Sequence, residues 1–270
     1  MGVNASSNAP RMLTSLAKSF RRGAQVVHVN PLIEAASTRT IVPHEMLDMA
    51  LFRSTRIGTM NVQPRIAGDL ALMRGVAKHL LEAAETNPEA VDQNFLDRFT
   101  SGFESYRKLV AATSWEEIEL QSGVSEAEIR KLGELYRRSR AAIISWCLGV
   151  TQQEHAVVTV REIMNVLLLR GNIGREGAGP CPIRGHSNVQ GNRTCGIDHR
   201  PDEAWLARMD QACGITSPRK SGLDTVRVIP AMARGDVKIF VGMGGNFALA
   251  TPDPAYSAKL RPHDPGQHET

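Results

Sequence analysis

Two patterns of apolar residues alternate along the chain, one spaced as on a helix and the other continuous over the length of a strand. Spacings of three and four residues predict helices at 12–20, 69–85, 92–110 with a break at Gly102, 126–136, 155–170, 202–212 and 224–234. Continuous apolar runs predict buried strands at 26–29, 142–148 and 237–241. Strands followed by glycine-bearing turns and then by helices predict an α/β fold with a parallel sheet.

Polar residues mark where some of these helices begin. Ser125 and Glu128 form a capping box in front of the fourth predicted helix. Asn8 is expected to cap the first helix and Asp69 the second. The opening residues have the composition of a loop between a strand and a helix, so the sequence predicts that the strand before this loop is missing. The weakly periodic stretch at 38–64 is expected to be mostly loop.

Composition narrows the functional classes. The 270 residues carry a net charge of +4 with 42% hydrophobic and 5% aromatic residues, enough to bury a core. The basic residues are scattered, with no patch interleaved with aromatics, which argues against a nucleic-acid partner. No apolar run has the length of a membrane span and no signal-peptide pattern opens the chain, so a cytoplasmic location and no membrane partner are expected.

The spacing of the cysteines does not match that of a metal site. Cys147, Cys181, Cys195 and Cys213 include no two that lie two or three residues apart, as a zinc ribbon or an iron–sulfur run would require. They are expected to be reduced thiols, and no metal ligand is assigned. The sequence also lacks a His-Glu-x-x-His motif and a Gly-x-Ser-x-Gly elbow.

Small and amide residues follow three predicted strands or strand ends, at 2–8, 149–152 and 242–246. Ligands of open α/β sheets bind beyond the carboxyl ends of the strands, and helix N-termini nearby favour phosphate. Tight turns would explain the same glycines, and both interpretations stay open at this point. Asn30 and Pro31 end another predicted strand, where a nucleotide fold meets a ribose or base. Asp69 has the acceptor pair that a guanine needs, besides its expected role as a helix cap.

The stretch "GPCPIRGHSNVQGNRTCG", residues 179–196, contains many donors and acceptors but no Asp or Glu. In extended chain, Arg184, His186 and Asn188 would share one side. Neutral amides beside arginine fit a large polar heterocycle with phosphates, although an ordered loop of Asx turns is the alternative. By their composition these residues indicate only a polar ligand; the family resemblance described next makes Arg184 and His186 the candidate catalytic residues, and Ser187, Asn188 and Gln190 candidate cofactor contacts.

Four motifs together resemble one known family. "GVNASSNAPRML", "LGVTQ", "LLLRGNIGREGAGPCPIRGHSNVQG" and "GGNFALATPD", in this order and spacing, are similar to the molybdopterin oxidoreductases of the dimethyl-sulfoxide-reductase superfamily. The resemblance is to the formate dehydrogenase alpha-subunit-like branch and runs from Gly2 to about Asp253. It implies an oxidoreductase with a bis(molybdopterin guanine dinucleotide) cofactor holding Mo or W, acting on a small-molecule substrate with an electron-transfer partner.

The resemblance also implies positions for this cofactor and for the domains. Cofactor contacts are implied at Gly2, Asn4, Asn8, Asn30, Pro31, Gly68, Asp69, Gly149, Gln152, Gln190, Gly191, Gly244 and Asn246. Arg184 matches the arginine beside the metal in formate dehydrogenases. The implied organisation is a Rossmann-like dinucleotide-binding lobe at 1–190 without its N-terminal strand, part of a second α/β lobe at 191–260, and an unstructured tail at 261–270.

The sequence departs from the family in two respects. Formate dehydrogenases read Gln-Asn where this chain has His186 and Ser187, so the resemblance does not assign formate as the substrate. The cysteines of the 4Fe–4S cluster and the metal-ligating residue, which precede the opening loop in the family, are not in this sequence. The chain is therefore expected to be an internal piece of a catalytic subunit, inactive by itself. The alternative is a non-catalytic dinucleotide-binding or scaffold remnant.

Overall fold

The computed structural model describes residues 1–43, 45–186, 188–251 and 253–258. Contacts between residues divide the chain into two compact units, Met1–His186 and Ser187–Thr270, each of which is described here by itself. The assignment of a cofactor-binding lobe to 1–190 and of a partial second lobe to 191–260 stays a prediction. The expected tail at 261–270 lies outside the described residues.

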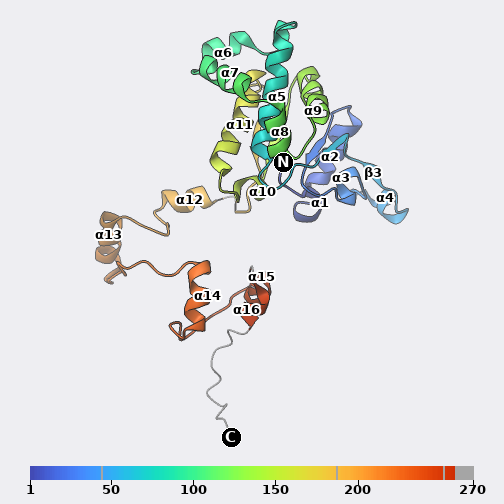
Figure 1. Cartoon of the computed structure of the whole chain (residues 1–270). Helices are drawn as coiled ribbons and strands as arrows, with labels where there is room; N and C mark the ends of the chain where they lie inside the picture. The colour runs from blue at the N-terminus through green and yellow to red at the C-terminus, as the bar shows by residue number, and fades with distance from the viewer. Residues whose placement is uncertain (44, 187, 252, 259–270) are drawn as a thin grey trace. The chain divides into compact units, whose positions relative to one another are not determined.

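Helices dominate the first unit (Figure 1). Its elements, in chain order, are α1 (Ala5–Asn8), α2 (Met12–Arg21), β1 (Val27–Val29), α3 (Ala35–Thr38), β2 (Arg39–Thr40), α4 (Met46–Ala50), β3 (Thr55–Arg56), β4 (Met60–Val62), α5 (Asp69–Ala84), the 3₁₀ turn η1 (Pro88–Ala90), α6 (Gln93–Phe99), α7 (Phe103–Ala112), α8 (Trp115–Ser122), α9 (Glu126–Arg138), β5 (Ile143–Trp146), α10 (Leu148–Thr151), α11 (Ala156–Leu169) and β6 (Gly179–Pro182).

The longer strands form two parallel pairs. β1 pairs with β4 from Val27↔Met60 to Val29↔Val62, and β5 pairs with β6 from Ile143↔Gly179 to Trp146↔Pro182. The short strands β2 and β3 are antiparallel. The predicted α/β class with parallel strands is confirmed. β4 lies in the stretch that was expected to be mostly loop. The apolar pattern did not predict this short strand because the polar Asn61 interrupts it.

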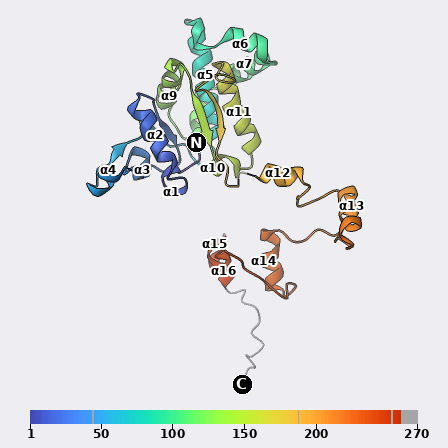
Figure 2. The ribbon, with the colours of Figure 1, turned by 180° about the vertical axis from the view of Figure 1, so that it is seen from behind.

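Met1 and Gly2 connect the two parallel pairs. The Met1 amino group donates to Ser145 O at 2.7 Å, and Cys147 N donates to Met1 O at 3.3 Å, which is the pattern of a parallel bridge to β5. On the other side, Gly2 N donates to Val29 O of β1 at 3.1 Å. Both ribbon views place the N-terminus between helices α1–α4 on one side and α5–α11 on the other (Figures 1 and 2).

β6 is a strand although it contains two prolines. Gly179 N donates to Ala142 O at 3.0 Å, and Ile183 N donates to Trp146 O at 2.8 Å, so alternate residues pair with β5. Pro180 and Pro182 occupy the intervening positions, whose backbone nitrogens face away from β5. Proline is tolerated on such an outer edge, where no N–H is needed. The polar stretch, for which extended chain and an ordered loop were both considered, therefore begins as a strand.

The main core lies among α5, α9, α11 and the parallel strands. The predicted apolar stripe of α5 is buried at Leu72, Met73, Val76, Ala77 and Leu80. The predicted burial of α11 holds from Ile163 onward, whereas Val157 in its first turn is 67% exposed. A smaller second cluster joins Leu13 and Ala17 of α2 to Val42 and Ile57.

One buried carboxylate is fully paired within this core. Glu162 on α11 accepts from Arg74 Nε on α5 at 2.5 Å, from Tyr106 Oη at 2.8 Å and from Asn165 Nδ2 at 3.2 Å. Burial and the neighbouring Glu162 charge raise the pKa of Tyr106. The hydrogen bonds offset the cost of removing the charge from water and tie three helices together.

The predicted caps hold in part. Ser125 Oγ accepts from Glu128 N at 3.4 Å, which confirms half of the capping box. Asn8 is the last residue of α1 and does not cap α2, whose N-cap position is Arg11. Asp69 is the first residue of α5 rather than its cap, and the N-cap position belongs to Gly68.

The described part of the second unit contains helices and no strand. Its elements are α12 (Val189–Thr194), α13 (Glu203–Cys213), α14 (Thr225–Ala233), α15 (Phe247–Ala250) and α16 (Pro254–Ala258). The predicted strand at 237–241 is wrong for this structure, since these residues have no regular secondary structure. Ile239 is 81% exposed and Val241 75%, so this stretch has the composition of a buried strand without a neighbour to pair with.

Two glycines permit a close backbone crossing, and this predicts a stability effect. A Cβ on Gly149 would lie 2.7 Å from the Cα and O of Gly2. We expect Gly149→Ala to lower the free energy of unfolding by about 1–3 kcal/mol, because backbone has to shift. Gly185→Ala is the matched control, since nothing lies within 4 Å of its Cβ position. Urea titrations of both variants measure the effect, and equal midpoints would contradict it.

The buried Met1 amino group predicts a dependence of stability on pH. Burial lowers its pKa from 8.0 to about 6, against an opposing effect of Asp69. The unfolded chain therefore takes up a proton between pH 8 and pH 6 that the folded chain does not. Stability should fall by roughly 2–3 kcal/mol as the pH decreases through this window.

Urea midpoints at pH 8.5, 7 and 6 would test this, on chain whose intact mass shows that Met1 is retained. An Nα-acetylated form is the control, because it has no amino group to titrate. It keeps His28 and His79, whose pKa values burial also lowers. An equal loss of stability in both forms would assign the effect to the histidines instead.

Candidate functional site

The carboxyl ends of the parallel strands bring several predicted residues to one edge of the sheet. Asn30 and Pro31 follow β1, and Asn4 follows the Met1–Gly2 segment. Gly149 follows β5, and Arg184 follows β6 after Ile183. These residues come from four separate parts of the sequence. Their convergence places a candidate binding site where open α/β sheets bind ligands.

Gly2 and Gly149 position the loops of this edge. Gly149 N donates to Gly2 O at 3.1 Å, and a Cβ on Gly2 would lie 2.7 Å from Val150 N. Gly2 also has φ +56°, a conformation that favours glycine. The crossing of the two backbones therefore accounts for both glycines, and it fixes the start of the Asn4 loop against the end of β5.

A cavity of about 430 Å³ lies beside this crossing. It is lined by three of the predicted residues, Asn4, Asn30 and Pro31, together with His28 and Glu34. The Asn30 amide donates to Val3 O at 3.1 Å, and the Asn4 amide donates to the Glu34 carboxylate. The cavity thus combines apolar walls with amide, imidazole and carboxylate groups, as sites for polar heterocycles do. Asn8 is exposed at the end of α1 and does not line it.

His28 contributes a polar atom that the fold leaves unpaired. Its Nε2 is buried and has no hydrogen-bond partner within the described residues. Burial lowers the pKa of His28, opposed by a backbone hydrogen bond with Ile57, so the ring is neutral at pH 7. An unpaired buried polar atom is costly, and this one lies beside Gly58, whose Cβ position is 3.4 Å from it. Sequence reasoning did not select His28, although a histidine inside an apolar strand was a visible signal.

Asp69 lies close to the crossing but not in this cavity. It is 6% exposed, and its carboxylate accepts from Gln153 Nε2 at 3.4 Å. Burial raises the pKa of Asp69, opposed by the Gln153 hydrogen bond and by the Met1 amino group. Its side chain thus supports the interior of the sheet edge, and its predicted role toward a guanine stays a prediction.

The neighbours of Asp69 show how tightly this corner is built. A Cβ on Gly68 would lie 2.7 Å from Ser122 O, so packing explains that glycine. Ala67 has φ +67°, which is strained for a residue with a side chain. Gln152, the predicted amide, is exposed, whereas the adjacent Gln153 donates to Gly149 O at 2.5 Å as well as to Asp69. The sequence motif therefore predicted Gln152, whereas the amide that forms these hydrogen bonds belongs to the next residue, Gln153.

Arg184 and His186, the candidate catalytic residues, are exposed beyond the end of β6. Ile183 still pairs with β5, so Arg184 follows the last ladder residue directly. Ser187 lies outside the described residues. Arg184 is thus exposed at the same sheet edge as the cavity.

The remaining predicted residues belong to the second unit. Asn188 is the N-cap position of α12, and Gln190 and Gly191 lie within this helix. These three residues are therefore at or in a helix rather than in an ordered loop. Gly244 has φ +68° in a turn, and Asn246 precedes α15. The cofactor roles of these residues stay predictions.

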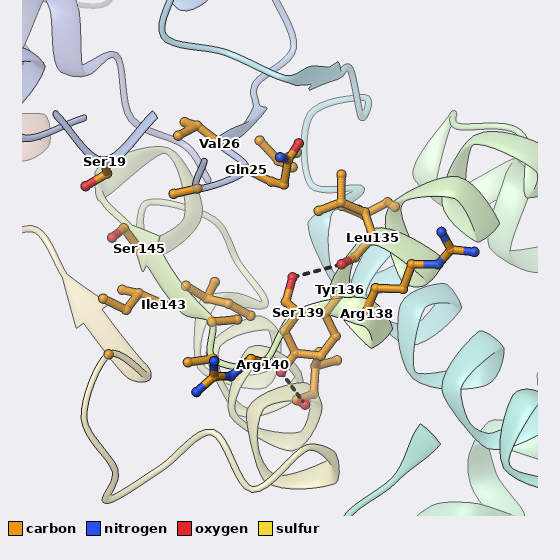
Figure 3. A pocket seen from close by; sticks show the side chains of 18 of the residues that line it. Ser19, Gln25, Val26, Leu135, Tyr136, Arg138, Ser139, Arg140, Ile143 and Ser145 are labelled. Carbon is orange, nitrogen blue, oxygen red and sulfur yellow. Dashed lines mark hydrogen bonds between the residues drawn. The ribbon is translucent and has the colours of Figure 1, made fainter. Parts of the chain in front are cut away.

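A larger cavity, of about 1510 Å³, lies at the opposite, amino-terminal edge of the sheet (Figure 3). Val26, Leu135, Ile143 and Ser145 are among its lining residues, and none of the predicted site residues lines it. Over the described ranges, no group of three or more His, Cys, Asp or Glu side chains could hold a metal ion. Within the same ranges, no helix is both long and apolar enough to cross a membrane.

Comparison with known proteins gives relatives that are oxidoreductases by name. An uncharacterized oxidoreductase of Mycobacterium tuberculosis is 44% identical over 262 residues, which cover 96% of this chain and 34% of the relative. Protein YdeP of Escherichia coli is 39% identical over 263 residues, covering 96% and 35%. Formate dehydrogenase H of Escherichia coli is 28% identical over 253 residues, covering 90% and 32%.

The chain thus spans about a third of the length of the curated relatives it matches. No family model matches it. Among solved structures, acetylene hydratase from Pelobacter acetylenicus shares the fold with a TM-score of 0.50 at 17% identity, over 62% of this chain and 20% of that one. By these relationships the chain is similar to oxidoreductases over nearly its whole length, with formate dehydrogenase H among its relatives, and it shares a fold with acetylene hydratase.

Proposed function

We propose that the first unit binds the guanine nucleotide part of a bis(molybdopterin guanine dinucleotide) cofactor in a Rossmann-like manner. The chain would thereby serve an oxidoreductase that oxidises or reduces a small substrate by two electrons. The observation that carries the proposal is the cavity at this edge, which His28, Asn4 and Asn30 line together. Three polar groups from two segments, the Asn4 loop and the end of β1, meet there at the carboxyl edge of parallel strands.

The residues of this edge fit the nucleotide part of the cofactor. The amides of Asn4 and Asn30 supply donors and acceptors for a base or ribose, and neutral His28 supplies one more of either kind. When bound, the cofactor supplies the metal, Mo or W, at which electrons are exchanged.

Arg184 is the residue that we assign to the substrate. Its guanidinium is exposed at the sheet edge. A planar guanidinium binds carboxylates and other oxyanions through paired hydrogen bonds. Arg184 would therefore orient a small anionic substrate, and His186, two residues later, would contribute a titratable group beside it.

The relatives support this assignment at the level of the reaction class. Several are named oxidoreductases, and one is named formate dehydrogenase H. His186 and Ser187 replace the usual Gln-Asn of formate dehydrogenases, so we propose a small substrate other than formate. An electron-transfer partner is part of the same proposal, because the substrate electrons need an acceptor or donor.

Guanine nucleotide binding tests the cofactor site directly. We expect the purified chain to bind guanosine diphosphate more tightly than adenosine diphosphate in calorimetric titrations at pH 7. Asn30→Ala should weaken binding roughly 2- to 13-fold, since one hydrogen bond contributes about 0.5–1.5 kcal/mol. Asn94→Ala is the matched control, because Asn94 is exposed on α6.

Failure of both nucleotides to bind, or equal affinities in Asn30→Ala and the parent chain, would contradict the site. Metal analysis of cofactor-loaded protein separates two outcomes. Guanine with Mo or W supports the oxidoreductase role, whereas guanine without metal favours a dinucleotide-binding protein that does not catalyse.

The Arg184 assignment makes a separate prediction for cofactor-loaded protein. Arg184→Ala should weaken binding of a small oxyanion such as nitrate roughly 10- to 150-fold, the equivalent of about 1.5–3 kcal/mol for a charge-assisted pair. The guanine content should not change, because Arg184 does not line the nucleotide cavity. Arg161→Ala, on the exposed face of α11, is the control. Unchanged oxyanion affinity in Arg184→Ala would remove the residue from the site.

A further inference from the structure

We propose that the smaller cavity, of about 430 Å³, accepts the nucleoside end of its ligand and that Glu34 binds the ribose hydroxyls. The base would lie against Leu32 and Ile66, and the phosphates would point out of the cavity. This inference rests on the proposed function. It adds the residues that select a ribose and the direction in which the nucleotide binds.

Charge decides which end of a nucleotide the cavity can hold. Among the described residues that line it, only Glu34 has a carboxylate, and none is an arginine or a lysine. The phosphates of a nucleotide are anionic, so this carboxylate repels them and no cation on the walls attracts them. A base and a sugar are uncharged, and they are therefore the part of the ligand that enters.

The Glu34 carboxylate has an oxygen to offer to a ligand. Its Oε2 accepts from the Asn4 amide, whereas its Oε1 accepts no hydrogen bond from the described residues. Ser37 N donates to Glu34 O at 2.9 Å, which fixes the backbone from which the side chain extends. The 2′ and 3′ hydroxyls of a ribose are adjacent donors, and a carboxylate only accepts hydrogen bonds. Glu34 is thus the group of this cavity that distinguishes a ribose from a sugar without hydroxyls.

Two exposed apolar side chains border the cavity. Leu32 is 74% exposed and Ile66 is 80% exposed, although both line it. They follow the neighbouring parallel strands β1 and β4, so they reach the cavity from adjacent loops. Gln63 Nε2 of one loop donates to Pro31 O of the other at 2.9 Å and joins the two. Apolar surface beside a few polar groups is what a heterocyclic base requires.

The loop that contains Ile66 is held in a strained conformation. Ala67 has φ +67°, which is uncommon for a residue with a side chain. Arg65 N donates to Ser122 O at 2.8 Å and anchors the same loop to the end of α8. Backbone strain of this kind is found where a ligand contact requires a fixed loop. The strain therefore supports a role for Ile66 at the cavity.

The hydroxyl dependence of nucleotide binding tests the assignment of Glu34. In calorimetric titrations of the full chain at pH 7, guanosine diphosphate should bind about 10- to 150-fold more tightly than its 2′,3′-dideoxy analogue, because hydrogen bonds to a charged group contribute that much. Guanosine should bind as tightly as guanosine diphosphate, since the phosphates lie outside the cavity. Ribose 5-phosphate has no base and should bind far more weakly.

In Glu34→Ala, guanosine diphosphate and its dideoxy analogue should bind equally tightly. The sign of the change separates two roles of the carboxylate. Loss of a ribose acceptor weakens the binding of guanosine diphosphate, whereas loss of an acid that only repels phosphates strengthens it. Glu104→Ala, exposed on α7, is the matched control and should keep the preference for the ribose. If Glu34→Ala does not fold, the preference of the parent chain decides alone.

Serine substitutions test the place of the base. Leu32→Ser and Ile66→Ser should each weaken guanosine diphosphate roughly 3- to 10-fold, since the base would cover part of each side chain. Leu109→Ser is the control, because Leu109 is also exposed but lies on α7. Unchanged affinity in both cavity variants would overturn the contact with the base.

Failure of this inference and failure of the proposed function give different results. If guanosine diphosphate does not bind, or if Asn30→Ala has no effect, the nucleotide site itself is wrong and this inference fails with it. If guanosine diphosphate binds with the expected effect of Asn30→Ala, equal binding of the dideoxy analogue overturns the role of Glu34 alone. Tighter binding of guanosine diphosphate to Glu34→Ala overturns it as well.

Discussion

The hydrogen bonds of Met1 and Gly2 are the constraint on which the first unit depends. They connect β4–β1 to β5–β6, two pairs that would otherwise be separate ribbons of two strands. Two-stranded ribbons are marginally stable by themselves, whereas a sheet packed against helices is stable. The same segment crosses Gly149 and thereby sets where the Asn4 loop, the end of β5 and the small cavity lie relative to one another.

This connection requires a charge to be buried. The Met1 amino group and Asp69 are both removed from water, and burial favours the neutral form of each. It therefore lowers the pKa of the amino group and raises the pKa of Asp69. Each charge partly offsets the shift of the other, so the two form a compensated pair beneath the sheet edge. Gln153 joins them through Asp69 and Gly149 O. Electrostatic interactions and close packing together therefore fix the residues that position the candidate site. This explains why the Gln153 amide lies next to the crossing of Gly2 and Gly149.

Local patterns in the sequence predicted local structure well and pairing poorly. The stripe of α5, the break at Gly102 and the Ser125 cap follow from interactions within a few residues, and each is present. The sequence patterns did not predict β4 and β6, which have three and four residues. Such short strands form only through hydrogen bonds to a neighbouring strand, and β6 also contains two prolines. For the site, the motifs located Asn4 and Asn30, while His28 and Gln153 depended on tertiary contacts that no spacing reveals.

A parallel strand buried on both faces is stable only between neighbours, and this rule accounts for features in both units. In the first unit Ile143 of β5 is 60% exposed, and among the described residues β5 pairs with β6 on one side and bonds only to Met1 on the other, at Ser145 and Cys147. In the second unit residues 237–241 have a strand composition, yet the described part of that unit offers no strand to pair with them. Sequence supplies the propensity in both places, but the hydrogen bonds that make a strand come from other segments. Where those segments are present, as at Met1–Gly2, two residues are enough to join a sheet.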